Sequence, residues 1–180
     1  MENKLYTLIV HSENRAGILS QITSVFTRQQ VNIESLNVSA SSIKGIHKYT
    51  ITAYSDEEQI QKISQQIEKK IDVLQSRVLT DDDIFIQEVA LLKISTPIML
   101  ENKNVCKVIR EHNAQILESN SIFSVVTATG LTDKIMDLYF ALDELNCVLQ
   151  YSRTGRIVIT KSKEEQLSAK IAKLEREHNQ

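Results

Sequence analysis

Residues 12–38 read SENRAGILSQITSVFTRQQVNIESLNV, and this stretch changes its pattern twice. It follows an apolar run, LYTLIV at residues 5–10, which is typical of a buried strand. Ile18, Ile22 and Val25 then recur at the spacing of one helical face. From residue 31 to 38 the pattern is extended again. The stretch therefore predicts strand, helix and strand in that order, with Gly17 at the first turn.

The segment that follows completes one folding unit. Residues 49–53 alternate between an apolar face and a threonine face, which predicts a strand that forms a hairpin with the preceding one across Gly45. The sequence SDEE at 55–58 fits a capping box, with Ser55 as the cap of a second helix. A closing strand begins near residue 71. The order β-α-β-β-α-β predicts an antiparallel four-stranded sheet with two helices on one face.

The same order recurs in the second half of the chain. Strands are expected at 85–95, 114–118, 122–129 and 147–159, with one helix through Val105 and Ile109 and another capped by Thr132. A short acidic joint at 80–83 separates the two copies. The predicted fold class is thus α+β, with two ferredoxin-like domains at residues 1–79 and 84–160. Residues 161–180 carry an apolar stripe, which predicts a C-terminal helix on the surface or against a partner (Leu167, Ile171 and Leu174).

The composition excludes several classes of protein. A net charge of −2 gives no electrostatic reason to expect nucleic acid or an anionic membrane as a partner. No apolar run is long enough to span a membrane, and the N-terminal residues do not resemble a signal peptide. The two cysteines, Cys106 and Cys147, form no CxxC pair. A cytoplasmic location is therefore expected.

No group of residues has the pattern of a catalytic site. There is no phosphate-binding glycine-rich loop, and Cys106 has no histidine or aspartate partner nearby in the sequence. His11 and His47 should approach each other on antiparallel strands, but nothing supplies a third metal ligand, so solvated loop histidines are expected. The run Asp81 to Asp83 is interpreted as a solvated linker. We therefore expect no catalytic residue, no metal site and no cofactor in this chain.

Two explanations of Gly17 remain open from the residues alone. It can simply allow a tight strand-to-helix turn, with Asn14 as a cap. Alternatively, it allows a carboxylate to approach the free N–H groups of the helix start. In the second case the amides of Asn14 and Asn32 could bind the charged groups of a free amino acid. Leu19 and Ile33 could then receive a small aliphatic side chain.

The stretch ENRAGILSQITSVFTRQQVNIESLNV resembles the opening motif of the regulatory small subunit of acetolactate synthase, also called acetohydroxyacid synthase. The usual form has N-x-x-G-[VL]-L-S-R-[VI]-x-x-[LV]-F followed by N-I-E-S-L-x-V. The similarity continues through residues 49–75, and FIQEVALLKI at 85–94 and SRTGRI at 152–157 resemble later parts of the family. The positions that carry the opening motif are Asn14, Gly17, Ile18, Leu19, Ser20, Phe26, Asn32, Ile33, Glu34, Ser35, Leu36 and Val38.

The resemblance implies a non-catalytic regulatory subunit whose first domain is an ACT domain that forms a homodimer, sheet edge to sheet edge. It implies that valine, or another branched-chain amino acid, binds between the loop of one subunit and the motif of the other. The implied ligand residues are Asn14, Gly17, Ile18, Leu19, Asn32 and Ile33. The implied partner is the large catalytic subunit, which carries thiamine diphosphate, Mg²⁺ and FAD and makes acetolactate for branched-chain amino-acid biosynthesis.

Two positions depart from the family pattern. Ala16 stands where many members have proline, which should loosen the loop before the first helix and raise the ordering cost of binding. Gln30 stands where many have glycine, and we expect it to alter the dimer seam. Both departures bear on the strength of feedback inhibition.

Two other functions compete with this interpretation. One is a tandem ACT-type amino-acid sensor that controls gene expression without an enzyme partner. The absence of a basic patch and of a helix-turn-helix pattern argues against it. The other is a small α/β-sandwich enzyme, against which the lack of a catalytic constellation argues.

Overall fold

The computed structural model describes residues 3–162, and these fall into two compact units. Contacts group residues 3–85 with residues 156–162, and residues 86–155 form the second unit. The sequence prediction had assigned 156–160 to the second domain. In the structure this segment belongs by its contacts to the first unit. The predicted C-terminal helix lies, from residue 163 on, outside the described residues.

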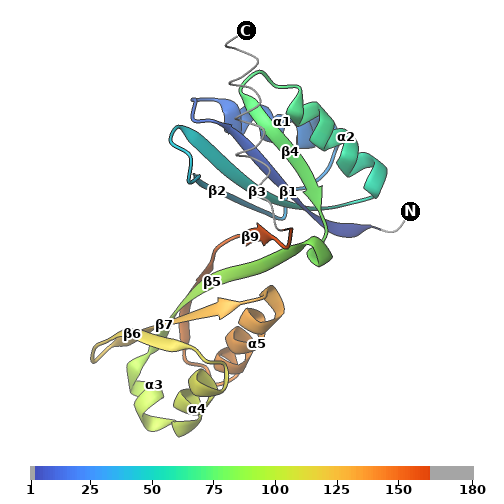
Figure 1. Cartoon of the computed structure of the whole chain (residues 1–180). Helices are drawn as coiled ribbons and strands as arrows, with labels where there is room; N and C mark the ends of the chain where they lie inside the picture. The colour runs from blue at the N-terminus through green and yellow to red at the C-terminus, as the bar shows by residue number, and fades with distance from the viewer. Residues whose placement is uncertain (1–2, 163–180) are drawn as a thin grey trace. The chain divides into compact units, whose positions relative to one another are not determined.

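The first unit has the predicted order of elements. An antiparallel sheet with strand order β2-β3-β1-β4 carries two helices on one face (Figure 1). Its elements are β1 (Lys4–Glu13), α1 (Ile18–Arg28), β2 (Ser35–Ala40), β3 (Ile46–Ser55), α2 (Glu57–Glu68) and β4 (Val73–Leu79).

Alternation along the central strands of this sheet separates a core face from a hydroxyl-rich face. Leu8, Val10, Ile51 and their apolar neighbours pack against the buried side chains of the helices. Thr50 and Thr52 of β3 lie on the opposite face, as their alternation predicted, and Thr7 of β1 lies beside Thr52; all three are buried too. This second face is therefore covered as well.

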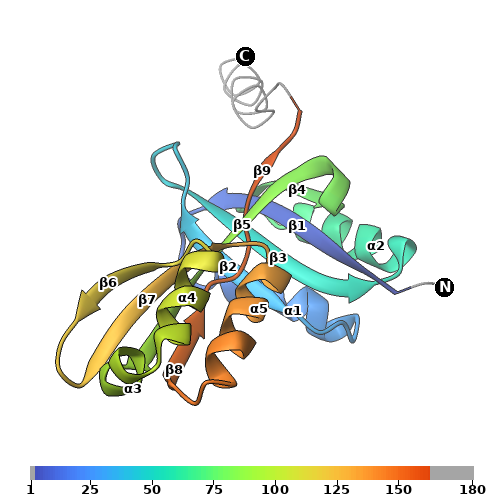
Figure 2. The ribbon, with the colours of Figure 1, turned by 90° about the horizontal axis from the view of Figure 1, so that it is seen from below.

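The cover on that face includes the last described strand, β9 (Ile157–Thr160). The Lys48 ammonium donates to the Val158 carbonyl oxygen at 2.7 Å. The Arg156 guanidinium donates to the Asp81 carboxylate at 2.7 Å and to the Thr7 hydroxyl at 3.4 Å. Figure 2 shows β9 beside the start of β5 (Ile84–Ser95), with which it pairs. The short helix η1 (Asp81–Asp83) joins β4 to β5.

The second unit repeats the architecture with one change. Its sheet has strand order β6-β7-β5-β8, and the place of one predicted helix is taken by two. Asn102 ends the first of these and caps the second through its side-chain oxygen. The elements are α3 (Thr96–Glu101), α4 (Lys103–Glu111), β6 (Gln115–Ser119), β7 (Phe123–Gly130), α5 (Thr132–Asp143) and β8 (Val148–Arg153).

Several predicted boundaries were wrong for identifiable reasons. The strand predicted at 147–159 is two strands, because residues 154–156 leave the sheet. Asp56, not Ser55, caps α2 by accepting from the Gln59 N–H. Thr132 is the first residue of α5 and donates instead to the Glu88 carboxylate. The predicted capping residue was therefore one residue before the observed N-cap of α2 and one residue after that of α5.

The prediction of two solvated loop histidines was wrong for His11. His11 lies within β1 and pairs with Lys48, while His47 pairs with Ser12. The Nδ1 atom of His11 is buried and has no hydrogen-bond partner. Burial, followed by repulsion from Lys48 and Arg77, lowers the pKa of His11 from 6.5 to about 4. His11 is therefore a neutral strand residue at physiological pH.

Candidate functional site

The loop between β1 and α1 is held in place by polar contacts. Arg15 bridges the Glu13 carboxylate at 2.9 Å and the Asp72 carboxylate at 3.0 Å. The Asn14 N–H donates to the Gly45 carbonyl oxygen at 2.8 Å. These contacts constrain the loop although Ala16 replaces the proline of the family pattern. The loop is thus tied to the neighbouring turns at Gly45 and Asp72.

Gly17 is the N-cap of α1 and adopts φ +88°, a left-handed conformation. Such a conformation is costly for most residues with a Cβ, so the turn by itself favours glycine here. No side chain caps the helix at this end. A Cβ placed on Gly17 would meet no atom within 4 Å. The space above the helix start is open, so both explanations of Gly17 are compatible with the geometry.

The other end of α1 closes with a Schellman motif. The Val31 N–H donates to the Phe26 carbonyl oxygen and the Gln30 N–H to that of Thr27, each at 3.1 Å. The motif needs a left-handed residue, and Gln30 takes that role with φ +54°. This explains in backbone terms why glycine suits the position in the family pattern. The second unit repeats the motif after α4, with Asn113 at φ +53°.

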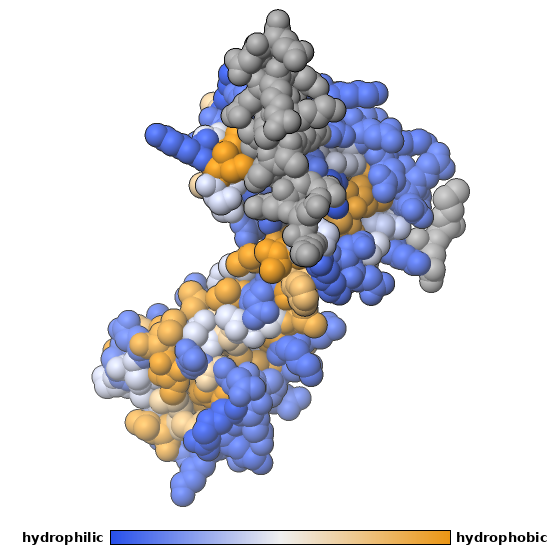
Figure 3. Space-filling view, viewed as in Figure 1, coloured by the Kyte–Doolittle hydropathy of each residue, from blue (hydrophilic) through white to orange (hydrophobic). Residues whose placement is uncertain are grey.

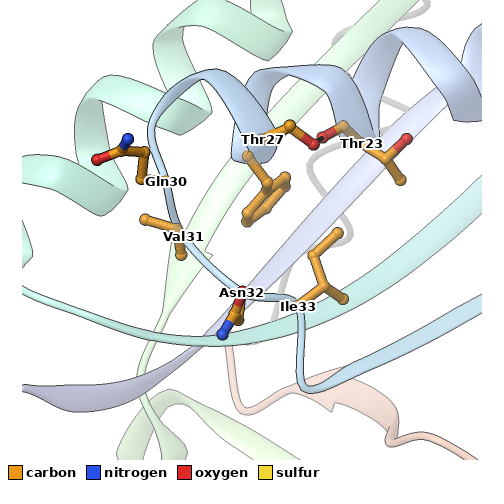
Figure 4. Close-up of a pocket in the computed structure, with 7 residues that line it drawn as sticks. Thr23, Thr27, Gln30, Val31, Asn32 and Ile33 are labelled. Carbon is orange, nitrogen blue, oxygen red and sulfur yellow. Dashed lines mark hydrogen bonds between the residues drawn. The ribbon is translucent and has the colours of Figure 1, made fainter.

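The Schellman turn forms one wall of an open hollow of about 450 Å³. Its apolar lining comes from Phe26, Val31 and Ile33, and Ile33 points toward α1 (Figure 4). Thr23 and Thr27 line it from the helix. Their hydroxyls donate to the carbonyl oxygens of Leu19 and Thr23, so only acceptor lone pairs remain for a ligand. Gln30 and Asn32 complete the lining.

The predicted ligand residues divide into two groups. Asn32 and Ile33 line the hollow, but they precede β2, which begins at Ser35 and not at Val31 as predicted. Asn14, Gly17 and Leu19 are exposed at the opposite end of α1. Ile18 is only 2% exposed and packs in the core, so only its backbone can face a ligand. In one subunit the predicted ligand residues thus lie in two separate places, at the two ends of α1.

The sequence interpretation missed the threonines and Phe26 as lining residues. Phe26 belongs to the family motif, and its helical spacing placed it in the core, where it does contribute. Thr23 and Thr27 lie one turn apart on the face that borders the hollow. The i, i+4 spacing of these two threonines could have indicated that they share one face of the helix.

The described residues contain no group of three histidine, cysteine, aspartate or glutamate side chains placed to hold a metal ion. Among residues 3–162, no helix is long and apolar enough to cross a membrane. What the arrangement offers chemically is an apolar, half-open hollow with amide and hydroxyl groups at its border. Such a site suits binding of a small amphipathic molecule.

Both halves of the chain match acetolactate synthase small-subunit families. Residues 8–75 match the AHAS small subunit-like ACT domain, and residues 87–162 match the small subunit of acetolactate synthase. The chain belongs to the acetolactate synthase small-subunit family. Its first unit is an ACT domain, as the sequence predicted.

The alignments of this chain with individual relatives cover nearly the whole length of each relative. The chain is 29% identical to the acetolactate synthase small subunit of Buchnera aphidicola, over 90% of this chain and all of the relative. It is 28% identical to that of Bacillus subtilis, over 87% of this chain and 90% of the relative. The crystal structure of the acetolactate synthase small subunit from Thermotoga maritima aligns with a TM-score of 0.80 at 18% identity. That alignment covers 89% of this chain and 99% of the other, and it confirms the two-domain α+β fold.

Proposed function

We propose that this chain is a regulatory subunit of acetolactate synthase, which activates the catalytic subunit and makes it responsive to a branched-chain amino acid. The observation that carries the proposal is the match of both halves of the chain to acetolactate synthase small-subunit families. A sensor without an enzyme partner could also have an ACT domain like that at residues 8–75. Such a sensor would not need the second small-subunit domain that residues 87–162 match.

The proposed effector is valine or a related branched-chain amino acid. Phe26, Val31 and Ile33 give the hollow an apolar lining, which suits a branched aliphatic side chain. The Asn32 amide points away from α1 (Figure 4), and the residue is exposed. It is thus available to a molecule held between this segment and the Gly17 loop of a second copy. Feedback then needs a coupling free energy of only about 1–3 kcal/mol between effector and enzyme.

The second copy is proposed to pair along β2, which is an edge of the first sheet. An open edge presents unpaired N–H and C=O groups, and proteins seldom leave one uncovered. Pairing of two β2 strands would bring the Gly17 loop of one subunit near Asn32 of the other. Sedimentation of the isolated chain at micromolar concentration should therefore show a dimer.

Catalysis is proposed to take place in the partner, with thiamine diphosphate, Mg²⁺ and FAD bound there and not by this chain. We expect both subunits to act in the cytoplasm. The test is co-elution: the chain mixed with an acetolactate synthase catalytic subunit should elute with it on gel filtration. Separate elution at micromolar concentrations would favour a sensor that has no enzyme partner.

A further inference from the structure

Residues 15–18 form a tight turn that leads into α1. The Ile18 N–H donates to the Arg15 carbonyl oxygen at 3.5 Å, which closes a four-residue turn. Gly17, at the third position, has φ +88° and ψ −13°. These angles are close to those of the third position of a type II turn, where glycine is preferred. Proline is common at the second position of such a turn, and Ala16 occupies that position here. The turn type therefore explains why proline suits position 16 in the family pattern.

Ala16 leaves this turn without the constraint that proline would supply. The ring of proline fixes φ near the value that the second position needs, whereas alanine samples other conformations in a free loop. A ligand that requires the turn in one conformation must then offset the free-energy cost of ordering it. A chain with alanine at position 16 consequently binds such a ligand more tightly if another contact holds the turn.

The Arg15 side chain supplies such a contact. Its Nε atom lies 2.9 Å from a carboxylate oxygen of Glu13, and its Nη1 atom lies 3.0 Å from a carboxylate oxygen of Asp72. Asp72 belongs to the turn between α2 and β4, so the guanidinium ties the loop to a neighbouring part of the unit. The backbone joins the same two segments, because the Glu13 N–H donates to the Asp72 carbonyl oxygen at 2.9 Å. The first residue of the turn is thus fixed through its side chain.

The exposure of these charged groups limits how much the bridge can contribute. The side chains of Arg15 and Glu13 are 62% and 45% exposed, whereas that of Asp72 is 21% exposed. Single exposed ion pairs stabilise a protein little, but one guanidinium that binds two carboxylates forms a small network. The bridge is therefore expected to change the affinity of a ligand a few-fold and not by orders of magnitude.

We propose that Arg15 is a positioning residue for the effector, because its bridge to Glu13 and Asp72 orders the turn that proline orders in many members of the family. The inference rests on the proposed function, in which the Gly17 loop contacts a branched-chain amino acid held near Asn32 of a second copy. It adds a residue that sets how strongly this loop binds. Arg15 acts through the turn, which presents the free N–H groups at the start of α1, and not by contact with the effector.

The test is calorimetric titration of the full chain with valine, for the parent and for Arg15→Met. The variant should bind valine about three- to tenfold more weakly, as expected for the loss of two partly exposed ion pairs. Ala16→Pro should restore the affinity in the Arg15→Met background, because the ring orders the turn without the bridge. Position 16 accepts proline, since Ala16 is exposed and its N–H donates no backbone hydrogen bond within residues 3–162.

The matched control is Lys62→Met, which removes an exposed ion pair on α2. Hydrophilic residues predominate in the part of Figure 3 where Figure 1 draws α2, so this change is made on an ordinary polar surface. Lys62→Met should leave the affinity for valine unchanged.

Asp72→Asn separates ordering of the turn from direct attraction of the effector. If Arg15 orders the turn, Asp72→Asn should weaken valine binding, because it removes one arm of the bridge. If the guanidinium instead attracts the effector carboxylate, the same change should strengthen binding, because it removes a competing negative charge. Hydrogen exchange of the Ile18 N–H in the free chain gives a second measurement, and it should be faster in Arg15→Met and slowed again by Ala16→Pro.

The outcomes distinguish this inference from the proposed function. Weaker valine binding of Arg15→Met and Asp72→Asn, with recovery on Ala16→Pro, supports the inference. Binding by the parent chain with no difference in Arg15→Met overturns the inference alone, even if exchange of the Ile18 N–H becomes faster. A loss of affinity that Ala16→Pro does not restore also overturns it. If the parent chain binds no branched-chain amino acid, the proposed effector is wrong and this inference fails with it.

Discussion

The Arg153 guanidinium donates a hydrogen bond to the Glu88 carboxylate at 2.5 Å, and Glu88 is only 3% exposed. The same carboxylate accepts from the Thr132 hydroxyl at 2.8 Å, at the start of α5. Glu88 therefore joins β5, β8 and α5 through one buried charge. Arg153 belongs to the SRTGRI segment, and its neighbour Thr154 accepts the Val89 N–H through its hydroxyl. Arg153 and Thr154 consequently hold elements of the second unit together.

Arg153→Met should destabilise the second unit by about 2–3 kcal/mol, because it removes the Arg153 cation from the buried Glu88 carboxylate. This value lies below the usual range of about 3–5 kcal/mol for a buried ion pair because Arg153 is about one-third exposed. Urea unfolding measures the effect. Adding Glu88→Leu to Arg153→Met should recover part of the loss, and Lys62→Met, at an exposed ion pair, should change nothing measurable. Equal effects of Arg153→Met and Lys62→Met would contradict this account.

Gln30→Gly should stabilise the first unit by about 0.5–1 kcal/mol. Gln30 has φ +54°, where glycine has no Cβ penalty, and this gain exceeds the added entropy of the unfolded chain. Thermal or urea unfolding tests it. The control is Gln29→Gly, which should destabilise, because Gln29 has an ordinary φ of −89°. A loss of stability on Gln30→Gly would show that contacts of the Gln30 side chain outweigh its backbone strain.

His11 should make the protein less stable as the pH falls from about 6.5 toward 4. Its pKa is lowered to about 4 in the folded state, so within this window the unfolded chain binds a proton that the folded chain does not. After a discount for its partial exposure, the loss is about 1–2 kcal/mol. His11→Gln should flatten the stability profile over this window relative to His47→Gln. Identical profiles for the two variants would exclude His11 as the cause.

Gly17→Asn separates the two explanations of that glycine. Asparagine tolerates a left-handed conformation, so the turn should survive while a side chain enters the open space above the helix. If an amino-acid carboxylate binds there, valine affinity should fall by about tenfold or more, as for loss of a hydrogen bond to a charged group. Calorimetric titration measures it. Gly45→Asn is the matched control, since Gly45 has φ +83° and equally open surroundings. If Gly17→Asn binds valine like the parent, Gly17 serves only the turn.

The order of helices and strands could be predicted from the sequence because apolar residues that become buried recur along it at helical or strand spacing. Ile51 and Thr52 face opposite sides of β3 as their alternation predicted, and Ile18, Ile22 and Val25 form the buried stripe of α1. These assignments depend only on local periodicity. The start of β2 was misplaced because Val31 is apolar for a different reason: it is the hydrophobic residue that follows the Schellman turn.

Contacts between residues far apart in the sequence could not be predicted from local periodicity. No local pattern indicates that Arg156 would bind Asp81, or that β9 would cover the hydroxyl face of the first sheet. Likewise Glu88 looked like a surface residue of a strand, and its burial depends on Arg153, which lies far along the chain. The candidate site was predicted in part for this reason. Asn32 and Ile33 come from one local motif, whereas Thr23 and Thr27 depend on how the loop folds back over α1.

The most direct test of the regulatory role is the rate of acetolactate formation by the catalytic subunit, measured with and without this chain and with and without valine. The account predicts that the chain alone converts no pyruvate and that its addition raises the rate of the catalytic subunit. Valine should lower that raised rate, and Asn32→Ala should weaken the inhibition by valine about 10- to 150-fold while leaving activation nearly intact. An unchanged rate at saturating chain, with binding of the two subunits confirmed, would contradict it.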